Sequence, residues 1–296
     1  KIYRSNNEVF YMMKFLKYFI EAFLVYLSFI ISKLLGLKIS RKLFSSLFIF
    51  FGPHFRKDQI VKKNLLKFNK KISNGEIKSI TNKMWSNYGM IFVEYIYLSY
   101  FRKKKKHVCI LGDKIIQNIL KQKKPVIFVS GHFANFELMS MEITKNNIKL
   151  ATIFRPLNNF FINPFMEYLR KKYICQNQIK KGLHGVRDAI EYIKKEFSIA
   201  LMIDQRVSEG EMIDFFGEPA LTTTLPAQLA IKYNLSIVPV FIERVGEDNF
   251  KIEFYDEIRP SGFKDKLELT KKLNEILEKM IVKNPNQWIW THNRWK

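Results

Sequence analysis

Short apolar runs alternate with longer amphipathic stretches over most of this 296-residue chain. Runs of β-favouring residues bounded by turn residues are typical of buried strands. They occupy residues 126–129, 149–154, 199–203, 236–242 and 250–255. Stretches with helical periodicity occupy residues 54–100, 161–172, 186–196, 225–233 and 266–281. The alternation predicts an α/β fold with a mostly parallel central sheet flanked by helices.

The N-terminal 52 residues follow a different pattern. Residues 18–35 are almost wholly apolar, interrupted by Glu21 and Lys33, and a second apolar run covers residues 43–51. A spanning helix needs about 20 apolar residues, so this region predicts a membrane-associated helical segment that spans shallowly or lies in the interface. A buried core helix is the alternative. We therefore divide the chain into an anchor, residues 1–52, and one domain, residues 53–296.

The charge of the chain narrows the class of partner. A net charge of +23 implies an anionic partner, and 27 Phe and 13 Tyr argue for a folded protein at a membrane interface. Nucleic acid is not expected, because no nucleic-acid-binding motif is present and such a protein has no use for the apolar N-terminal region. A non-enzymatic basic membrane-binding protein would explain the charge and the anchor.

A histidine and a glutamate follow the first strand of the predicted domain. Gly131 ends the strand, His132 follows it, and Glu137 comes five residues later. On a straight helix these two positions lie about 140° apart, but a strand–turn–helix bend allows them to meet. Glu137 would then orient the imidazole and leave its second nitrogen free as a general base, with Asn135 capping the helix. A polar turn that satisfies its own backbone is the alternative.

Two other strands also end in charged residues. Arg155 follows the strand at residues 149–154, and Asp204 and Arg206 follow the strand at residues 199–203. The carboxyl ends of parallel strands share one edge of a sheet, so these residues are expected near His132. Arg155 has a structural alternative, an ion pair at the strand end, and Arg206 is expected to pair with Asp204. The two cysteines show no metal-ligand pattern, and no metal site is expected.

Five motifs in this order resemble one family. They are S-G-H-F-A-N-F-E at residues 130–137, F-R-P-L-N-N at 154–159, D-Q-R at 204–206, T-T-T-L-P-A-Q-L-A at 222–230 and Q-W-I-W-T-H-N-R-W-K at 287–296. Together they resemble the lipid A biosynthesis late acyltransferases of the lauroyl and myristoyl type. That family belongs to the glycerolipid acyltransferase superfamily, which is marked by H-x4-D/E.

The resemblance implies a glycerolipid-acyltransferase-like fold and a specific reaction. The enzyme would move an acyl chain from an acyl carrier protein thioester to a hydroxyl of a lipid A precursor, without a cofactor. It would work at the cytoplasmic face of the Gram-negative inner membrane, in contact with anionic lipids. A lysophospholipid, an ornithine lipid or a phosphatidylinositol mannoside is the alternative acceptor.

The resemblance also implies roles for individual residues. His132 would be the general base and Glu137 its orienting carboxylate. The residues expected to bind substrate are Arg155, Arg170, Asp204 and Asn135. The C-terminal residues His292, Arg294 and Trp295 belong to a motif of the family, but an aromatic tail packed on the domain is the simpler expectation for them.

Overall fold

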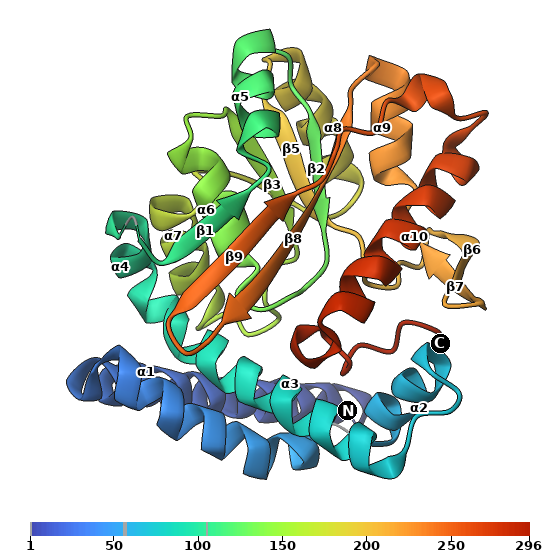
Figure 1. The fold of residues 1–296 in the computed structure, drawn as a ribbon. Coiled ribbons are helices and arrows are strands. Elements are labelled where there is room, and N and C mark those ends of the chain that lie inside the picture. Colours follow the sequence, from blue (N-terminus) through green and yellow to red (C-terminus); the bar gives the residue numbers. More distant parts are fainter. Residues whose placement is uncertain (1, 56–57, 105) are drawn as a thin grey trace.

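The computed structural model describes residues 2–55, 58–104 and 106–296, and its centre is a seven-stranded sheet (Figure 1). The strand order is β1-β9-β8-β2-β5-β3-β4. The strands are β1 (Val108–Leu111), β2 (Ile127–Ser130), β3 (Leu150–Phe154), β4 (Asn177–Lys180), β5 (Ser198–Met202), β8 (Ile237–Val245) and β9 (Asn249–Phe254). Strands β8, β2, β5, β3 and β4 run parallel, whereas β9 pairs antiparallel with β8 and parallel with β1. The predicted mostly parallel sheet is confirmed.

Helices flank this sheet, and a separate hairpin lies beside the last of them (Figure 1). The helices of this part are α5 (Asp113–Gln122), α6 (Glu137–Lys145), α7 (Asn163–Tyr173), α8 (Leu183–Lys194), α9 (Leu225–Tyr233) and α10 (Lys266–Lys283). The hairpin consists of β6 (Glu211–Phe215) and β7 (Glu218–Thr222). Strand β2 is fully buried and is the middle strand of the sheet. The residues that follow it therefore lie at the centre of the sheet's edge.

Helices α1 (Ile2–Phe55), α2 (Asp58–Phe68) and α3 (Asn74–Glu94) form a layer beside the carboxyl end of β8 (Figure 1). The 3₁₀ turn η1 (Tyr95–Tyr97) connects α3 to α4 (Leu98–Lys103), which lies beside α6 and α7. Helix α1 bends at Gly36, whose φ of 76° is open to glycine at little steric cost. Helix α1 packs along α3, where the ring of Phe92 contacts those of Phe29, Phe44 and Phe48.

The close approach of α1 and α3 depends on Gly89. A Cβ atom at this position would lie 2.2 Å from the carbonyl oxygen of Phe44, so only glycine fits without a shift of the backbone. The aromatic stripe along residues 85–98 packs against α1 at Phe92. The part of α1 before Gly36 differs, since most of its apolar side chains are exposed.

One helix in the described part of the chain is long and apolar enough to cross a membrane, and it covers residues 9–54 of α1. Its first half also touches the loop before α7, where Phe15 and Phe19 contact the ring of Phe161. The side chain of Asn159 in that loop donates a hydrogen bond to the carbonyl of Tyr18 at 2.8 Å. Helix α1 thus contacts both α3 and the loop before α7.

Candidate active site

Three strands deliver polar residues to one edge of the sheet, as expected. Strand β2 pairs in parallel with β5, and β5 pairs in parallel with β3. His132, Asp204 and Arg155 follow the carboxyl ends of β2, β5 and β3, respectively. The predicted convergence is confirmed for these three residues.

The imidazole of His132 is bonded to the carboxylate of Asp204. The distance from His132 Nδ1 to Asp204 Oδ1 is 2.7 Å, and the backbone N–H of His132 donates to Asp204 Oδ2 at 2.7 Å. Trp288 Nε1 also donates to Oδ2, at 2.9 Å. Burial opposes the charge on Asp204, but His132 and these hydrogen bonds outweigh burial and hold the pKa of Asp204 below its ordinary value.

This arrangement fixes the protonation pattern of the imidazole. An ionised carboxylate can only accept hydrogen bonds, so Nδ1 of His132 carries a proton and Nε2 keeps its lone pair in the neutral ring. The side chain of His132 is 20% exposed, whereas that of Asp204 is fully buried. The ring of Phe136 packs against the imidazole, with ring centres 4.7 Å apart. The imidazole is therefore held in one orientation and stays partly exposed.

The predicted contact between His132 and Glu137 is wrong, because Glu137 points elsewhere. Its Oε1 accepts hydrogen bonds from Arg170 Nε and from the hydroxyl of Tyr95, both at 2.7 Å. Glu137 opens helix α6, and from this position its side chain is directed at η1 and α7 rather than at the end of β5. The carboxylate that orients the imidazole is Asp204.

Glu137, Arg170 and Tyr95 form a compact polar cluster. Arg170 Nη2 also donates to the hydroxyl of Tyr95 at 3.1 Å. Burial and the neighbouring Glu137 charge raise the pKa of Tyr95, so its hydroxyl keeps its proton. Burial disfavours the charge on Arg170, but Glu137 outweighs that effect and raises the pKa of Arg170. The cluster thus holds a positively charged guanidinium in a fixed position.

Two further expectations about side chains are wrong. Asn135 does not cap helix α6; its amide donates to Glu94 Oε2 at 2.8 Å, and the helix begins after Phe136 without a side-chain cap. Arg206 does not pair with Asp204, whose oxygens are occupied by His132 and Trp288. Arg206 Nε instead donates to the carbonyl of Lys296 at 3.1 Å.

A cavity of about 520 Å³ opens beside His132. Of the predicted residues, His132, Glu137, Arg155 and Arg170 line it, while the lining does not include Asp204 or Asn135. Its apolar lining includes residues of β3, β5 and α9, namely Ile153, Phe154, Ala200, Leu201, Met202 and Leu225. About half of the lining residues are apolar and the others are polar or charged, so the cavity suits an amphipathic ligand, such as an acyl chain joined to a polar group.

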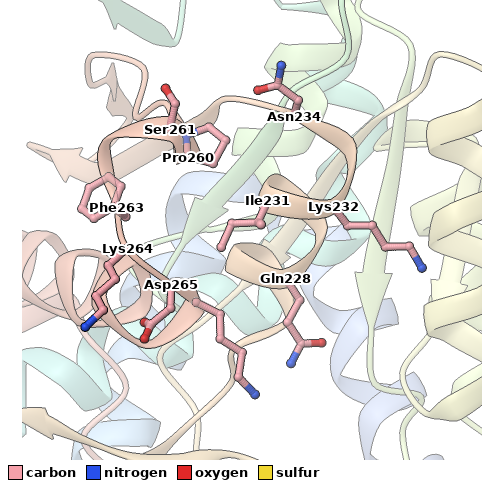
Figure 2. A pocket seen from close by; sticks show the side chains of 10 residues that line it. Gln228, Ile231, Lys232, Asn234, Pro260, Ser261, Phe263, Lys264 and Asp265 are labelled. Carbon is pink, nitrogen blue, oxygen red and sulfur yellow. The ribbon is translucent and has the colours of Figure 1, made fainter.

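A second depression, of about 660 Å³, lies at the far end of α9 (Figure 2). Its lining includes Lys232 from α9 and the Lys264–Lys266 segment that leads into α10. No residue in the described part of the chain lines both hollows. The candidate chemistry belongs to the one at His132.

Sequence reasoning missed two members of the site, Trp288 and Tyr95. Trp288 lies in the C-terminal motif, which was expected to pack as an aromatic tail, and it does pack, with its ring 4.6 Å from that of Trp290. Its indole N–H nevertheless holds Asp204. Tyr95 lies on the aromatic stripe expected to face the core. Each side chain carries a polar atom, the indole N–H or the phenol hydroxyl, and such an atom needs a hydrogen-bond partner when it is buried. That requirement could have pointed to both residues.

The fold and site define a class: an α/β enzyme with a buried carboxylate–histidine pair at a partly apolar cavity, next to a long apolar helix. The family model for bacterial lipid A biosynthesis acyltransferases matches residues 11–296. The chain belongs to this family and is an acyltransferase.

Individual relatives agree with the family. The chain is 25% identical over 250 residues to a lipid A biosynthesis lauroyltransferase of Escherichia coli K12, covering 81% of this chain and 79% of the relative. It is 22% identical over the same shares to a lipid A biosynthesis palmitoleoyltransferase of that organism. A crystal structure of the 1-acyl-sn-glycerophosphate acyltransferase PlsC of Thermotoga maritima aligns with a TM-score of 0.42 and 15% identity, over 86% of this chain and 100% of that one. At that level of similarity no functional inference follows.

Proposed function

We propose that this enzyme transfers a fatty acyl chain from an acyl carrier protein thioester to a hydroxyl group of a lipid A precursor, with His132 as the general base. The observation that carries the proposal is the hydrogen bond between His132 Nδ1 and Asp204, which leaves Nε2 available at the cavity. Membership of the lipid A biosynthesis family supports the class of acceptor.

In the proposed reaction His132 both takes up and returns the transferred proton. Nε2 takes the proton of the acceptor hydroxyl as its oxygen attacks the thioester carbon, and a C–O bond forms. The resulting imidazolium is stabilised by the buried negative charge of Asp204. When the tetrahedral intermediate collapses, the C–S bond breaks and Nε2 returns the proton to the departing sulfur. A positioned base of this kind typically contributes about 10²–10⁴-fold to the rate.

Two arginines at the cavity can stabilise the negative charge that develops during acyl transfer. The tetrahedral intermediate carries an oxyanion, and loss of one donor to such an oxygen typically costs about 2.7–4 kcal/mol. Arg155 lines the cavity from the end of β3, and Arg170 lines it with its guanidinium fixed by Glu137. We assign both to substrate binding or oxyanion stabilisation. Glu137 acts through Arg170 in this scheme and has no contact role at the imidazole.

The proposed partners match the charge of the protein. An acyl carrier protein and a phosphorylated glycolipid are both anionic, and complementary charge speeds association with a chain of net charge +23. The exposed apolar half of α1 supports attachment to the cytoplasmic face of the inner membrane, whose anionic lipids favour a basic protein.

Mass spectrometry of lipids from cells with and without this chain tests the proposal. Loss of one acyl chain from lipid A in the cells that lack the protein is the expected result, and its mass gives the chain length. Unchanged lipid A together with a shift in lysophospholipids or ornithine lipids would refute the lipid A acceptor.

A further inference from the structure

Glu94, at the end of α3, lies outside the catalytic cavity and is fully buried. Its carboxylate accepts four hydrogen bonds. Oε1 accepts from Arg41 Nε and Arg244 Nη1, both at 2.7 Å, and Oε2 accepts from Arg244 Nη2 at 3.0 Å and Asn135 Nδ2 at 2.8 Å. Burial opposes its charge, but Arg244 and Arg41 outweigh burial and lower the pKa of Glu94.

One arm of this cluster reaches the loop between His132 and Glu137. Asn135 is the contact of Glu94 in that loop. Its neighbour Ala134 has a φ of 40°, which is uncommon for a residue with a side chain and needs support from its surroundings. Ala134 N–H donates to the carbonyl of Gln287, and the side chain of Gln287 bonds both backbone groups of Arg244, at 2.7 and 3.0 Å. Asn135 is thus held by Glu94, and its neighbour Ala134 is held by Gln287, which is itself bonded to the backbone of Arg244.

The other arm reaches the apolar helix α1. Arg41 lies after the bend at Gly36, and its side chain is only 5% exposed. Besides Glu94, Arg41 Nη1 bonds the Asp248 carboxylate at 2.5 Å and the Glu247 carbonyl at 3.0 Å in the β8–β9 turn. Helix α1 is therefore linked to the catalytic loop through one carboxylate.

We infer that Glu94 is a positioning residue for the catalytic loop and that Arg41 of α1 completes its support, so that the helix expected to serve as an anchor also sets the turnover rate. The inference rests on the proposed role of His132, because it concerns the loop that carries this base. A misplacement of about 1 Å at a catalytic group can lower a rate on the order of 10²-fold.

Arg41→Gln is the informative variant, because Arg244 keeps its bidentate pair with Glu94 and the buried carboxylate stays neutralised. Glu94→Gln would instead leave the buried guanidinium of Arg244 without a counter-ion, while Arg41 keeps only Asp248, and an unpaired buried charge is strongly destabilising. The matched control is Lys42→Gln. It removes the same charge one residue along, from a side chain that is 66% exposed. Asn135→Leu cuts the same network at the loop.

The experiment measures kcat and KM for the acyl donor and for the lipid acceptor, per mole of folded enzyme, together with binding to anionic vesicles. We expect Arg41→Gln and Asn135→Leu each to lower kcat about 10- to 100-fold with KM and vesicle binding close to wild type, and Lys42→Gln to match wild type. The double variant should be no slower than the worse single variant, because both changes cut one network.

Three results would overturn the inference: an unchanged kcat for folded Arg41→Gln, a rise in KM alone, or a double variant whose loss is the product of the single losses. His132→Ala in the same assay separates the two proposals. If it retains wild-type activity, the proposed mechanism fails, whatever Arg41 does.

Discussion

Replacement of Asp204 by asparagine should disable the base while keeping the fold. Oδ2 of Asp204 accepts two N–H groups, from the His132 backbone and from Trp288, so the amide oxygen of an asparagine must take that place. Its NH₂ group then faces Nδ1 of His132 and donates to it. The imidazole must therefore move its proton to Nε2, where the free lone pair was needed.

The expected loss of kcat in Asp204→Asn follows from this change of tautomer. In a serine protease the corresponding Asp-to-Asn change lowers kcat by about 10⁴-fold for the same reason. Since each tenfold is about 1.36 kcal/mol of activation free energy, we expect a loss of about 5.5 kcal/mol in Asp204→Asn. The hydrogen bonds to His132 N–H and Trp288 are kept, so the variant should remain folded.

Single-turnover acyl transfer, followed by mass spectrometry of the acceptor, measures this loss. Asp188→Asn on the exposed face of α8 is the matched control and should leave the rate unchanged. A folded Asp204→Asn enzyme within a factor of about ten of wild type would refute the argument that Asp204 fixes the imidazole tautomer.

Three further outcomes test the fold. Gly89→Ala should destabilise the protein by about 1–3 kcal/mol through the clash with Phe44, whereas Gly75→Ala should not, because its Cβ would meet nothing closer than Ser73 Oγ at 3.9 Å; thermal unfolding measures both. Burial and nearby lysines lower the pKa of His107 to about 4, so only the unfolded chain gains this proton between about pH 6.5 and 4. The free energy of unfolding should therefore fall by about 1.4 kcal/mol for each unit by which the pH is lowered across that window. A His107→Leu variant should lose less over the same window, and equal losses in both proteins would contradict this assignment. Serine in place of the exposed Phe23 of α1 should weaken cosedimentation with anionic vesicles without changing the unfolding temperature.

The convergence of His132, Arg155 and Asp204 could be predicted because parallel strands share one carboxyl edge. The partner of the imidazole could not. The choice between Glu137 and Asp204 depends on how the chain leaves β2 through Ala134, whose φ of 40° is a conformation that residue spacing does not specify.

Two other features could not be predicted from the sequence either. The burial of Arg41 could not, because its partner Glu94 lies 53 residues away, and Glu94 in turn meets Arg244 across 150 residues. Strand β4, Asn177–Lys180, carries three polar residues out of four and pairs only with β3 at the edge of the sheet, so it lacks the apolar run that marks the central strands.

The central claim is that His132 is the base for acyl transfer to a lipid A precursor. Purified wild-type and His132→Ala enzymes, incubated with acyl carrier protein thioester and precursor in vesicles, test it most directly by the mass of the product. We expect the wild-type enzyme to add one acyl chain and the folded, vesicle-bound His132→Ala variant to be slower by about 10²–10⁴-fold or more. Transfer by the variant at the wild-type rate would contradict the account.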